Sequence, residues 1–212
     1  MSTTTTAATL DLDAMAEVAD ATYPGDAGRP VDHVLIDGTN YTGTDKRIIK
    51  TYRADHVPFD HPVWVHPTTG AQIDDTGGPL IESIRALVAG ALDGPVQVST
   101  PDVAELDAAL DALLCLLDFS VSRVHLLPGL IAAGDPVSLG AAPTVETQAM
   151  FVQVPSLQVS ASWEIVVDAQ LLQSTLTGLT GAVDLHQAGE GAALGLQDGR
   201  RTRLLMPIKK VG

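Results

Sequence analysis

The strongest constraint on the fold is a repeated spacing. Asp11 and Asp102 each open a helical segment and lie 91 positions apart, and Leu80 and Leu171, which begin two further apolar stripes, are separated by the same interval. A period of this size is typical of an internal duplication. The sequence therefore predicts two copies of a unit built as strand, helix, strands, helix, strands, with the boundary near residues 94–99.

Four helices are predicted from apolar residues at intervals of three and four and from capping residues at their starts. The third is the clearest, with Leu106, Leu110 and Leu113 on one face and Thr100 as its expected cap. In the first helix Leu12 is expected on the buried face, and Cys115 in the third is expected to be a small buried thiol. The predicted helices cover residues 10–22, 79–92, 101–118 and 168–179.

The stretches between these helices are short and β-rich, and glycine, proline and aspartate separate them. Several alternate apolar and polar residues, as in an antiparallel sheet with one face on the core. The chain is therefore predicted to be α+β with more strand than helix. The predicted strands cover residues 31–37, 41–53, 63–66, 96–99, 121–127, 136–140, 150–154, 160–167, 182–187, 193–197 and 202–208.

The composition limits the partners. Twelve Lys and Arg against 26 Asp and Glu give a formal net charge of -14, so the molecule as a whole repels nucleic acid and anionic membranes. A single cysteine excludes an intramolecular disulfide and fits a reducing compartment. Residues 1–8 lack the features of a signal peptide and are expected to be disordered, and no apolar run suits a membrane span. We expect a soluble, cytoplasmic protein with no membrane partner.

No pattern of residues predicts catalysis. The serines lack a Gly-x-Ser-x-Gly context, and the glycine-rich stretches lack the Lys-Ser/Thr of a phosphate loop. His56, His61 and His66 recur at fives and invite a metal interpretation, but intervening prolines exclude a helix and an odd spacing along a strand alternates faces. An exposed histidine-rich loop is the favoured interpretation. We expect no enzyme activity, no metal and no cofactor.

Two stretches carry a resemblance to a known family. Residues 204–210, Leu-Leu-Met-Pro-Ile-Lys-Lys, follow a predicted helix and hairpin, and residues 41–49, Tyr-Thr-Gly-Thr-Asp-Lys-Arg-Ile-Ile, follow the apolar strand at 34–38. Together they resemble the last strand with its tail, and a characteristic strand pair, of bacterial DNA polymerase III β sliding clamps. The resemblance covers most of the chain as a pattern but only about ten residues as motif.

The resemblance implies a DNA-clamp-like α+β fold with two similar domains, each with two helices packed on antiparallel sheet. Domain 1 would span residues 9–95 in shortened form, because little chain separates the second and third helices, and domain 2 would span 96–212. Copies would close head to tail into a ring around double-stranded DNA without sequence specificity, with a trimer favoured. The implied function is a DNA polymerase processivity factor that works with a polymerase and a clamp loader, in a system such as that of a phage.

The resemblance also implies a pocket for short extended peptides of replication proteins. Methionine and leucine would give it an adaptable apolar surface, and the flanking cations would favour polar or acidic peptide ends. The alternative is that the last apolar residues form only a buried strand. The predicted pocket residues are Thr44, Asp45, Lys46, Arg47, Ile48, Leu204, Leu205, Met206, Pro207, Ile208 and Lys209.

The charge pattern departs from that family. The first and third predicted helices carry carboxylates and no basic residue, whereas clamps contact DNA phosphates through Lys and Arg on their inner helices. Loops and strand ends could supply the contacts, the ring could hold DNA topologically, or the fold could serve partner binding alone, as in a structural or assembly subunit with oligomer contacts only. The predicted DNA-contact residues are Lys50, Arg53, Arg85, Arg123, Arg200, Arg201 and Arg203.

Overall fold

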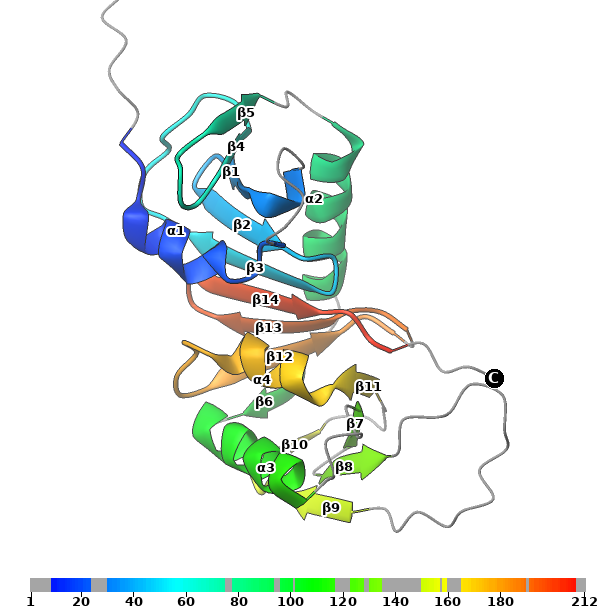
Figure 1. The fold of residues 1–212 in the computed structure, drawn as a ribbon. Coiled ribbons are helices and arrows are strands. Elements are labelled where there is room, and N and C mark those ends of the chain that lie inside the picture. Colours follow the sequence, from blue (N-terminus) through cyan, green and yellow to red (C-terminus); the bar gives the residue numbers. More distant parts are fainter. Residues whose placement is uncertain are drawn as a thin grey trace, which may run out of the picture. The chain divides into compact units, whose positions relative to one another are not determined.

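The structure is a computed structural model that describes most of the chain between residues 9 and 208. The described residues are 9–23, 30–74, 78–93, 96–100, 102–116, 123–127, 130–134, 150–156, 158–159, 165–189 and 191–208. The chain forms two compact units, residues 1–84 and 85–212 (Figure 1). The division falls inside helix α2, Pro79–Leu92. The domain limits 9–95 and 96–212 stay predictions.

Unit 1 is an antiparallel sheet with a helix on one face. Its strand order is β5-β4-β1-β2-β3, and helix α1 contacts β1, β2 and β3 (Figure 1). A short 3₁₀ turn, Pro30–Asp32, precedes the first strand. The elements are α1 Leu12–Ala19, β1 Val34–Asp37, β2 Asn40–Thr44, β3 Ile48–Arg53, β4 Val63–Val65 and β5 Gln72–Asp74.

The core of unit 1 lies between α1 and one face of this sheet. Met15 and Val18 of α1 pack with Val34 and Val65 of the sheet in one buried cluster. Tyr41, in the same cluster, accepts a hydrogen bond on its hydroxyl from the backbone N–H of Asp11, and burial raises the pKa of the Tyr41 phenol. The sheet thereby fixes the start of the helix that covers it.

Asp11 caps α1, but Leu12 does not face the core. The Asp11 side chain accepts from the Ala14 backbone N–H at 2.9 Å, so the helix begins at Leu12. Leu12 is 73% exposed, whereas Ala14 is fully buried. The prediction for Leu12 was wrong because the first helical residue lies off the stripe formed by Ala14, Met15 and Val18.

The predicted strand at residues 41–53 is two strands. The side chain of Asp45 accepts from the backbone N–H groups of Arg47 and Ile48, both at 2.8 Å. Lys46 has a φ of 74°, in the left-handed region that folds the chain back on itself. This turn ends β2 at Thr44 and starts β3 at Ile48. The local hydrogen bonds of Asp45 therefore override the β-rich composition of the segment.

Unit 2 consists of two halves that exchange their first strands. One sheet has the order β10-β6-β12-β13-β14, and the other has the order β11-β7-β8-β9. The strand before α3 therefore lies in the sheet of the second half, and the strand before α4 lies in the sheet of the first. The elements are β6 Val96–Thr100, α3 Val103–Leu116, β7 Arg123–Leu127, β8 Leu130–Gly134, β9 Met150–Gln153, β10 Gln158–Val159, β11 Ile165–Asp168, α4 Ala169–Leu176, β12 Val183–Gln187, β13 Leu194–Asp198 and β14 Arg201–Leu205.

Helices α3 and α4 pack side by side and bury the predicted apolar stripes (Figure 1). Leu106, Leu110 and Leu113 of α3 and Leu172 of α4 are each no more than 2% exposed. Asp168 caps α4, because its side chain accepts from the backbone N–H groups of residues 170 and 171. The cap of α3 is Asp102 and not Thr100, because the Asp102 side chain accepts from the Ala104 backbone N–H at 2.8 Å.

The two units share a strand order. In unit 1, β4-β1-β2-β3 follows the same sequence of neighbours as β11-β7-β8-β9 in unit 2. Helices α1 and α3 each precede the three consecutive strands of these sheets, and both begin after a capping aspartate. Among the described residues, α2 leads to β6 with no strand between them, whereas three strands follow α4. The predicted α+β class, with four helices on antiparallel sheets, is confirmed.

The remaining differences concern short strands. Predicted boundaries elsewhere differ by a few residues, and β5, β8 and β10 were not predicted. β8 reads Leu-Ile-Ala-Ala-Gly and lacks the alternation of polar residues on which the prediction relied. The predicted strand at 136–140, and residues 160–164 of another, lie outside the described residues.

Gly43 offers a test of the packing of α1. A Cβ built on Gly43 would lie 2.2 Å from the backbone oxygen of Val18, so the helix end and β2 must separate to accept alanine. We expect Gly43→Ala to destabilise unit 1 by about 1–3 kcal/mol. Urea unfolding followed by Trp64 fluorescence in a Trp163→Phe background measures this.

The matched control is Gly90→Ala in α2, where a Cβ meets nothing within 4 Å. This change should leave stability unchanged or raise it by up to about 1 kcal/mol, because alanine is the better helix former. Equal unfolding free energies for the wild type and Gly43→Ala would contradict the close contact between α1 and β2.

Candidate functional site

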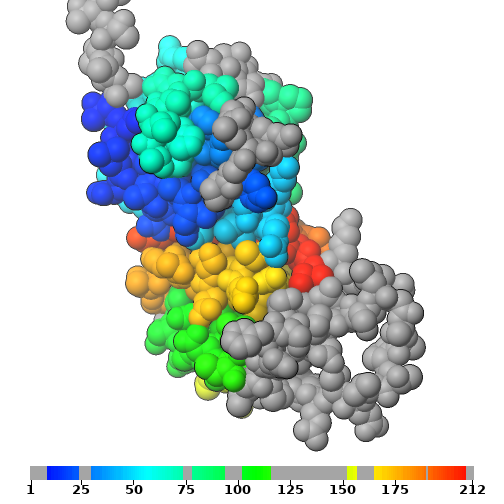
Figure 2. All heavy atoms as spheres, viewed as in Figure 1, coloured from blue at the N-terminus to red at the C-terminus, as the bar shows by residue number. Residues whose placement is uncertain are grey.

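The predicted C-terminal pocket residues divide into a buried pair and a partly exposed segment. Leu204 and Leu205 end β14 with no exposed surface. Residues 206–208, Met-Pro-Ile, which we call the tail segment, are half-buried. Figure 2 shows atoms near the red end of the colour scale at the surface, beside the yellow of the α4 region. The leucine pair is therefore buried at the end of the strand, whereas the tail segment is partly exposed.

The tail segment leaves one sheet of unit 2 and reaches the other. The Ile208 backbone N–H donates to the carbonyl of Val166 in β11 at 2.8 Å. β11 pairs with β7. Pro207 has no N–H to donate, so the backbone of this short apolar stretch cannot donate at every residue. Lys209, the last predicted pocket residue, lies outside the described residues.

The predicted residues in unit 1 form the turn between β2 and β3. The Thr44 hydroxyl donates to the carbonyl of Ile48 at 2.9 Å and accepts from the Lys46 backbone N–H at 3.0 Å. With the two bonds that Asp45 accepts, these contacts close the turn on itself. Ile48 is buried, while Lys46 and Arg47 are exposed. Thr44, Asp45 and Ile48 thus shape the turn that displays two cations.

The turn at residues 44–48 belongs to unit 1 and the tail segment to unit 2. Each is formed by contacts within its own unit. Their combination in one peptide-binding pocket, which the sequence resemblance implied, stays a prediction.

Two of the predicted DNA-contact residues are buried. Lys50 is 1% exposed and its ammonium lies 2.6 Å from the Asp20 carboxylate at the end of α1. Arg203 has no exposed surface. These two predictions need correction, because a strand residue whose side chain faces the interior cannot present its charge to a phosphate. A buried cation also requires partners, which explains the aspartate beside Lys50.

The other predicted DNA-contact residues differ in exposure. Arg53, Arg85 and Arg200 are exposed. Arg201 is 31% exposed and lies 3.7 Å from the Asp198 carboxylate. The backbone of Arg123 is part of β7, and its side chain lies outside the described residues. The exposed arginines lie at strand ends and on α2 and not on α3 or α4.

Helix α3 gives the paired helices of unit 2 an acidic surface. Green atoms of α3 and yellow to orange atoms of α4 lie next to each other in Figure 2. Gln173 of α4 donates to the carboxylates of Asp111 at 2.6 Å and Asp107 at 3.5 Å. Neither helix contains a lysine or arginine. This surface repels phosphate, as the charge pattern of the third helix predicted.

The histidines of the predicted loop each make a separate contact. His56 bonds the carbonyl of Thr9, His61 bonds Asp60 and thereby lowers the pKa of that carboxyl group, and His66 accepts from two backbone N–H groups of its own turn. Among the described residues, no three His, Cys, Asp or Glu side chains are placed to hold a metal ion.

Two further expectations can be compared with the structure. Cys115 is exposed and not buried, because it lies beside the leucine stripe of α3 on the side away from the core. In the part of the chain that is described, no helix combines the length and the apolarity that a bilayer crossing requires.

Comparison with known proteins shows which fold this is. The chain is similar to the Caulobacter crescentus polymerase III β subunit, with a TM-score of 0.70, 13% identity and coverage of 93% of this chain and 64% of that one. It is also similar to a Pseudomonas aeruginosa DNA polymerase sliding clamp, with a TM-score of 0.68, 15% identity and coverage of 93% of this chain and 64% of that one. A third similar structure is the Helicobacter pylori β clamp bound to a DNA ligase peptide, with a TM-score of 0.65, 13% identity and coverage of 93% of this chain and 63% of that one.

These similarities establish a sliding-clamp fold. The chain spans less than two thirds of the length of each of the three clamps, and identities this low show the fold alone. No protein-family model and no curated protein matches the sequence.

The buried Lys50 predicts an asymmetric response to substitution. Asp20→Asn leaves the ammonium without its counter-charge and should destabilise unit 1 by about 1–3 kcal/mol, less than for a fully buried pair because Asp20 is 55% exposed. Lys50→Met replaces the cation with an apolar chain of similar length and should cost less than about 1 kcal/mol. Urea unfolding measures both.

The double variant Asp20→Asn with Lys50→Met is the control, since it should lose less unfolding free energy than Asp20→Asn alone. If Asp20→Asn lowered the unfolding free energy equally in the wild type and in Lys50→Met, the ion pair would not be the cause of the destabilisation.

Proposed function

We propose that this chain is a sliding clamp, a DNA polymerase processivity factor without catalysis of its own. The observation that carries the proposal is the sliding-clamp fold combined with a partly exposed Met-Pro-Ile tail segment directly after the buried end of β14. A tether of this kind raises the effective concentration of a polymerase at the primer end.

The tail segment is the proposed docking surface for partner peptides. A partly exposed apolar stretch directly after a strand suits an extended peptide, which can add apolar side chains and backbone hydrogen bonds there. The Helicobacter pylori clamp of similar fold is bound to a DNA ligase peptide, which supports this kind of ligand. The exposed Lys46 and Arg47 are the proposed cations of the same pocket.

We propose that copies of the chain form a ring around double-stranded DNA, placed there by a clamp loader. The proposed phosphate contacts are Arg53, Arg85, Arg123, Arg200 and Arg201, and Lys50 and Arg203 are left out because they are buried. A trimeric ring would require two complete domains in each chain. Since the described part of unit 1 resembles only one half of unit 2, the copy number has to be measured.

A second candidate is a structural or assembly subunit of the same fold that encircles nothing. The helix pair α3 and α4 favours it, because α3 is acidic and neither helix contains a cation that could attract phosphate. The two candidates differ in whether binding depends on the topology of the DNA.

The tail segment gives the first test. We expect Met206→Ala with Ile208→Ala to weaken binding of a cognate polymerase peptide at least about tenfold while the unfolding free energy falls by no more than about 2 kcal/mol. Fluorescence anisotropy with a labelled peptide, beside urea unfolding, gives both values.

Two controls distinguish docking from folding. Leu87→Ala removes an apolar side chain that is 42% exposed on α2 and should leave peptide affinity unchanged. Leu204→Ala removes a fully buried side chain and should cost about 2–5 kcal/mol. If the tail variant lost as much stability as Leu204→Ala, the tail segment would be core and the docking surface would be refuted.

The second test concerns DNA topology. With its cognate loader, the protein should co-elute with nicked circular DNA at high salt, leave after linearisation and stay when bulky proteins block both ends. High salt removes phosphate attraction but not encirclement. Equal retention on circular and open linear DNA, or none on either, would favour the subunit that encircles nothing.

A further inference from the structure

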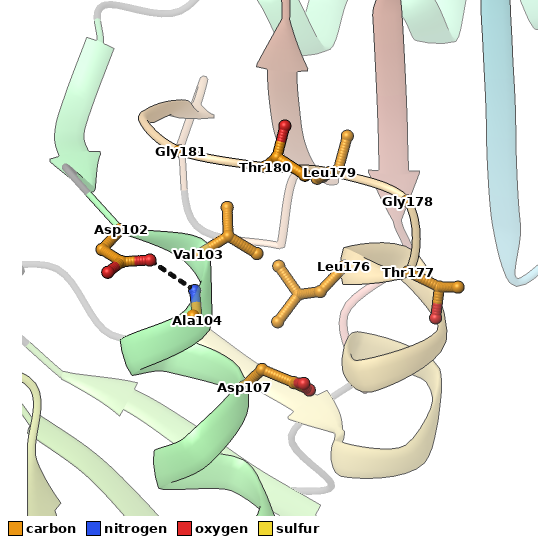
Figure 3. A pocket seen from close by; sticks show the side chains of 10 residues that line it. All are labelled: Asp102, Val103, Ala104, Asp107, Leu176, Thr177, Gly178, Leu179, Thr180 and Gly181. Carbon is orange, nitrogen blue, oxygen red and sulfur yellow. Dashed lines mark hydrogen bonds between the residues drawn. The ribbon is translucent and has the colours of Figure 1, made fainter.

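A pocket of about 370 Å³ lies between the start of α3 and the end of α4, entirely within unit 2. Its walls are the first turns of α3 and the loop at residues 177–181. Figure 3 shows Val103 and Leu176 in the space between the two helices, with Asp107 on the following turn of α3. Val103 is 6% exposed and Leu176 3%, so they form an apolar floor under a polar rim.

The backbone donors at the start of α3 are already used. Val103 N–H donates to the carbonyl of Gly181 at 3.0 Å, and Glu105 N–H donates to the carbonyl of Asp102 at 3.2 Å. Ala104 N–H donates to the Asp102 side chain at 2.8 Å. This helix start therefore has no donor left for an anion in its first three residues, and its partial positive charge faces a carboxylate.

The groups that remain around the rim are mostly acceptors. Asp107 is half-exposed, and its bond from Gln173 is long at 3.5 Å because that amide lies 2.6 Å from Asp111. The end of α4 adds the negative end of its helix dipole. Neither helix nor the loop at 177–181 contains a lysine or arginine. The pocket thus has an apolar floor and two carboxylates at its rim. The helices and the loop that form it supply no cation to neutralise them.

We propose that this pocket binds a lysine or arginine side chain of a basic segment in a partner protein. The aliphatic stem covers Val103 and Leu176, and the charged end meets Asp102 and Asp107. Charge complementarity selects this occupant, since an acidic peptide or a phosphate would meet two carboxylates. The proposal does not rest on the sliding-clamp function, because the pocket belongs to unit 2 alone and lacks the tail segment.

The test uses short peptides and the full chain. Acetyl-Ala-Lys-Ala-amide is titrated while NMR follows the methyl signals of Val103 and Leu176 and the amides of Gly178 and Gly181. We expect saturable shifts that weaken as salt rises, and smaller shifts or none with the matched norleucine peptide, which has the stem without the charge. Equal binding of the two peptides would overturn the proposal, as would the absence of shifts.

Variants identify the carboxylates. Asp102→Asn with Asp107→Asn should weaken the lysine peptide at least about tenfold, while asparagine keeps both the helix cap and the acceptor for Gln173. Asp13→Asn with Asp93→Asn makes the same charge change at exposed positions outside the pocket and should leave the affinity unchanged. If both double variants weakened binding of the lysine peptide equally, the effect would come from net charge alone and the site would be refuted.

Two other occupants are tested alongside. Tighter binding of putrescine than of the lysine peptide would overturn the assignment to a protein partner in favour of a free amine. Pocket signals that shift on Lys209→Ala with Lys210→Ala, without added peptide, would overturn it in favour of the chain's own basic end. Unchanged signals in this variant and weak putrescine binding are the expected results.

Discussion

The exchange of first strands between the halves of unit 2 is the constraint on which the other features of that unit depend. β6 lies in the sheet of β12–β14, and β11 lies beside β7, so neither half completes its sheet from its own residues. Pairing across long sequence separations holds α3 and α4 side by side. It also gives β11 the position from which Val166 accepts a hydrogen bond from Ile208. The tail segment, the helix pair and the pocket between the helix ends all follow from this exchange.

A shared strand order relates the two units. β4-β1-β2-β3 repeats the order β11-β7-β8-β9, and the fourth strand in each case comes from later in the chain than the three consecutive ones. The 91-residue interval between Asp11 and Asp102 relates the helices that precede these strands. In unit 2 a second sheet follows α4, and no counterpart follows α2 among the described residues. A ring assembled from such chains would therefore join unlike modules, and its symmetry follows from their contacts and not from a count of equal domains.

The sequence predicted what depends on local pattern. Helical periodicity located all four helices, because it depends only on neighbours in the sequence. Side-chain burial in the sheets depends on distant partners, so Lys50 and Arg203 were wrongly taken for surface cations. β8 was not predicted because its residues do not alternate with polar ones. The pocket near Val103 was not predicted because it is formed by residues about 75 positions apart in the chain. The difference in burial between Leu205 and Met206 also became visible only in the structure, since both residues are apolar.

Burial of cations bears on how such a fold could hold DNA. With 12 basic residues against 26 acidic ones, each cation in the interior makes the surface more negative, and Lys50 and Arg203 are both in the interior. The carboxylates of α3 add to this negative surface, and α4 beside it contains no cation. A protein of this kind gains no affinity for DNA from counterion release along those helices. If it encircles DNA, closure of the ring has to supply the retention, and the acidic helix surface is left for basic partners.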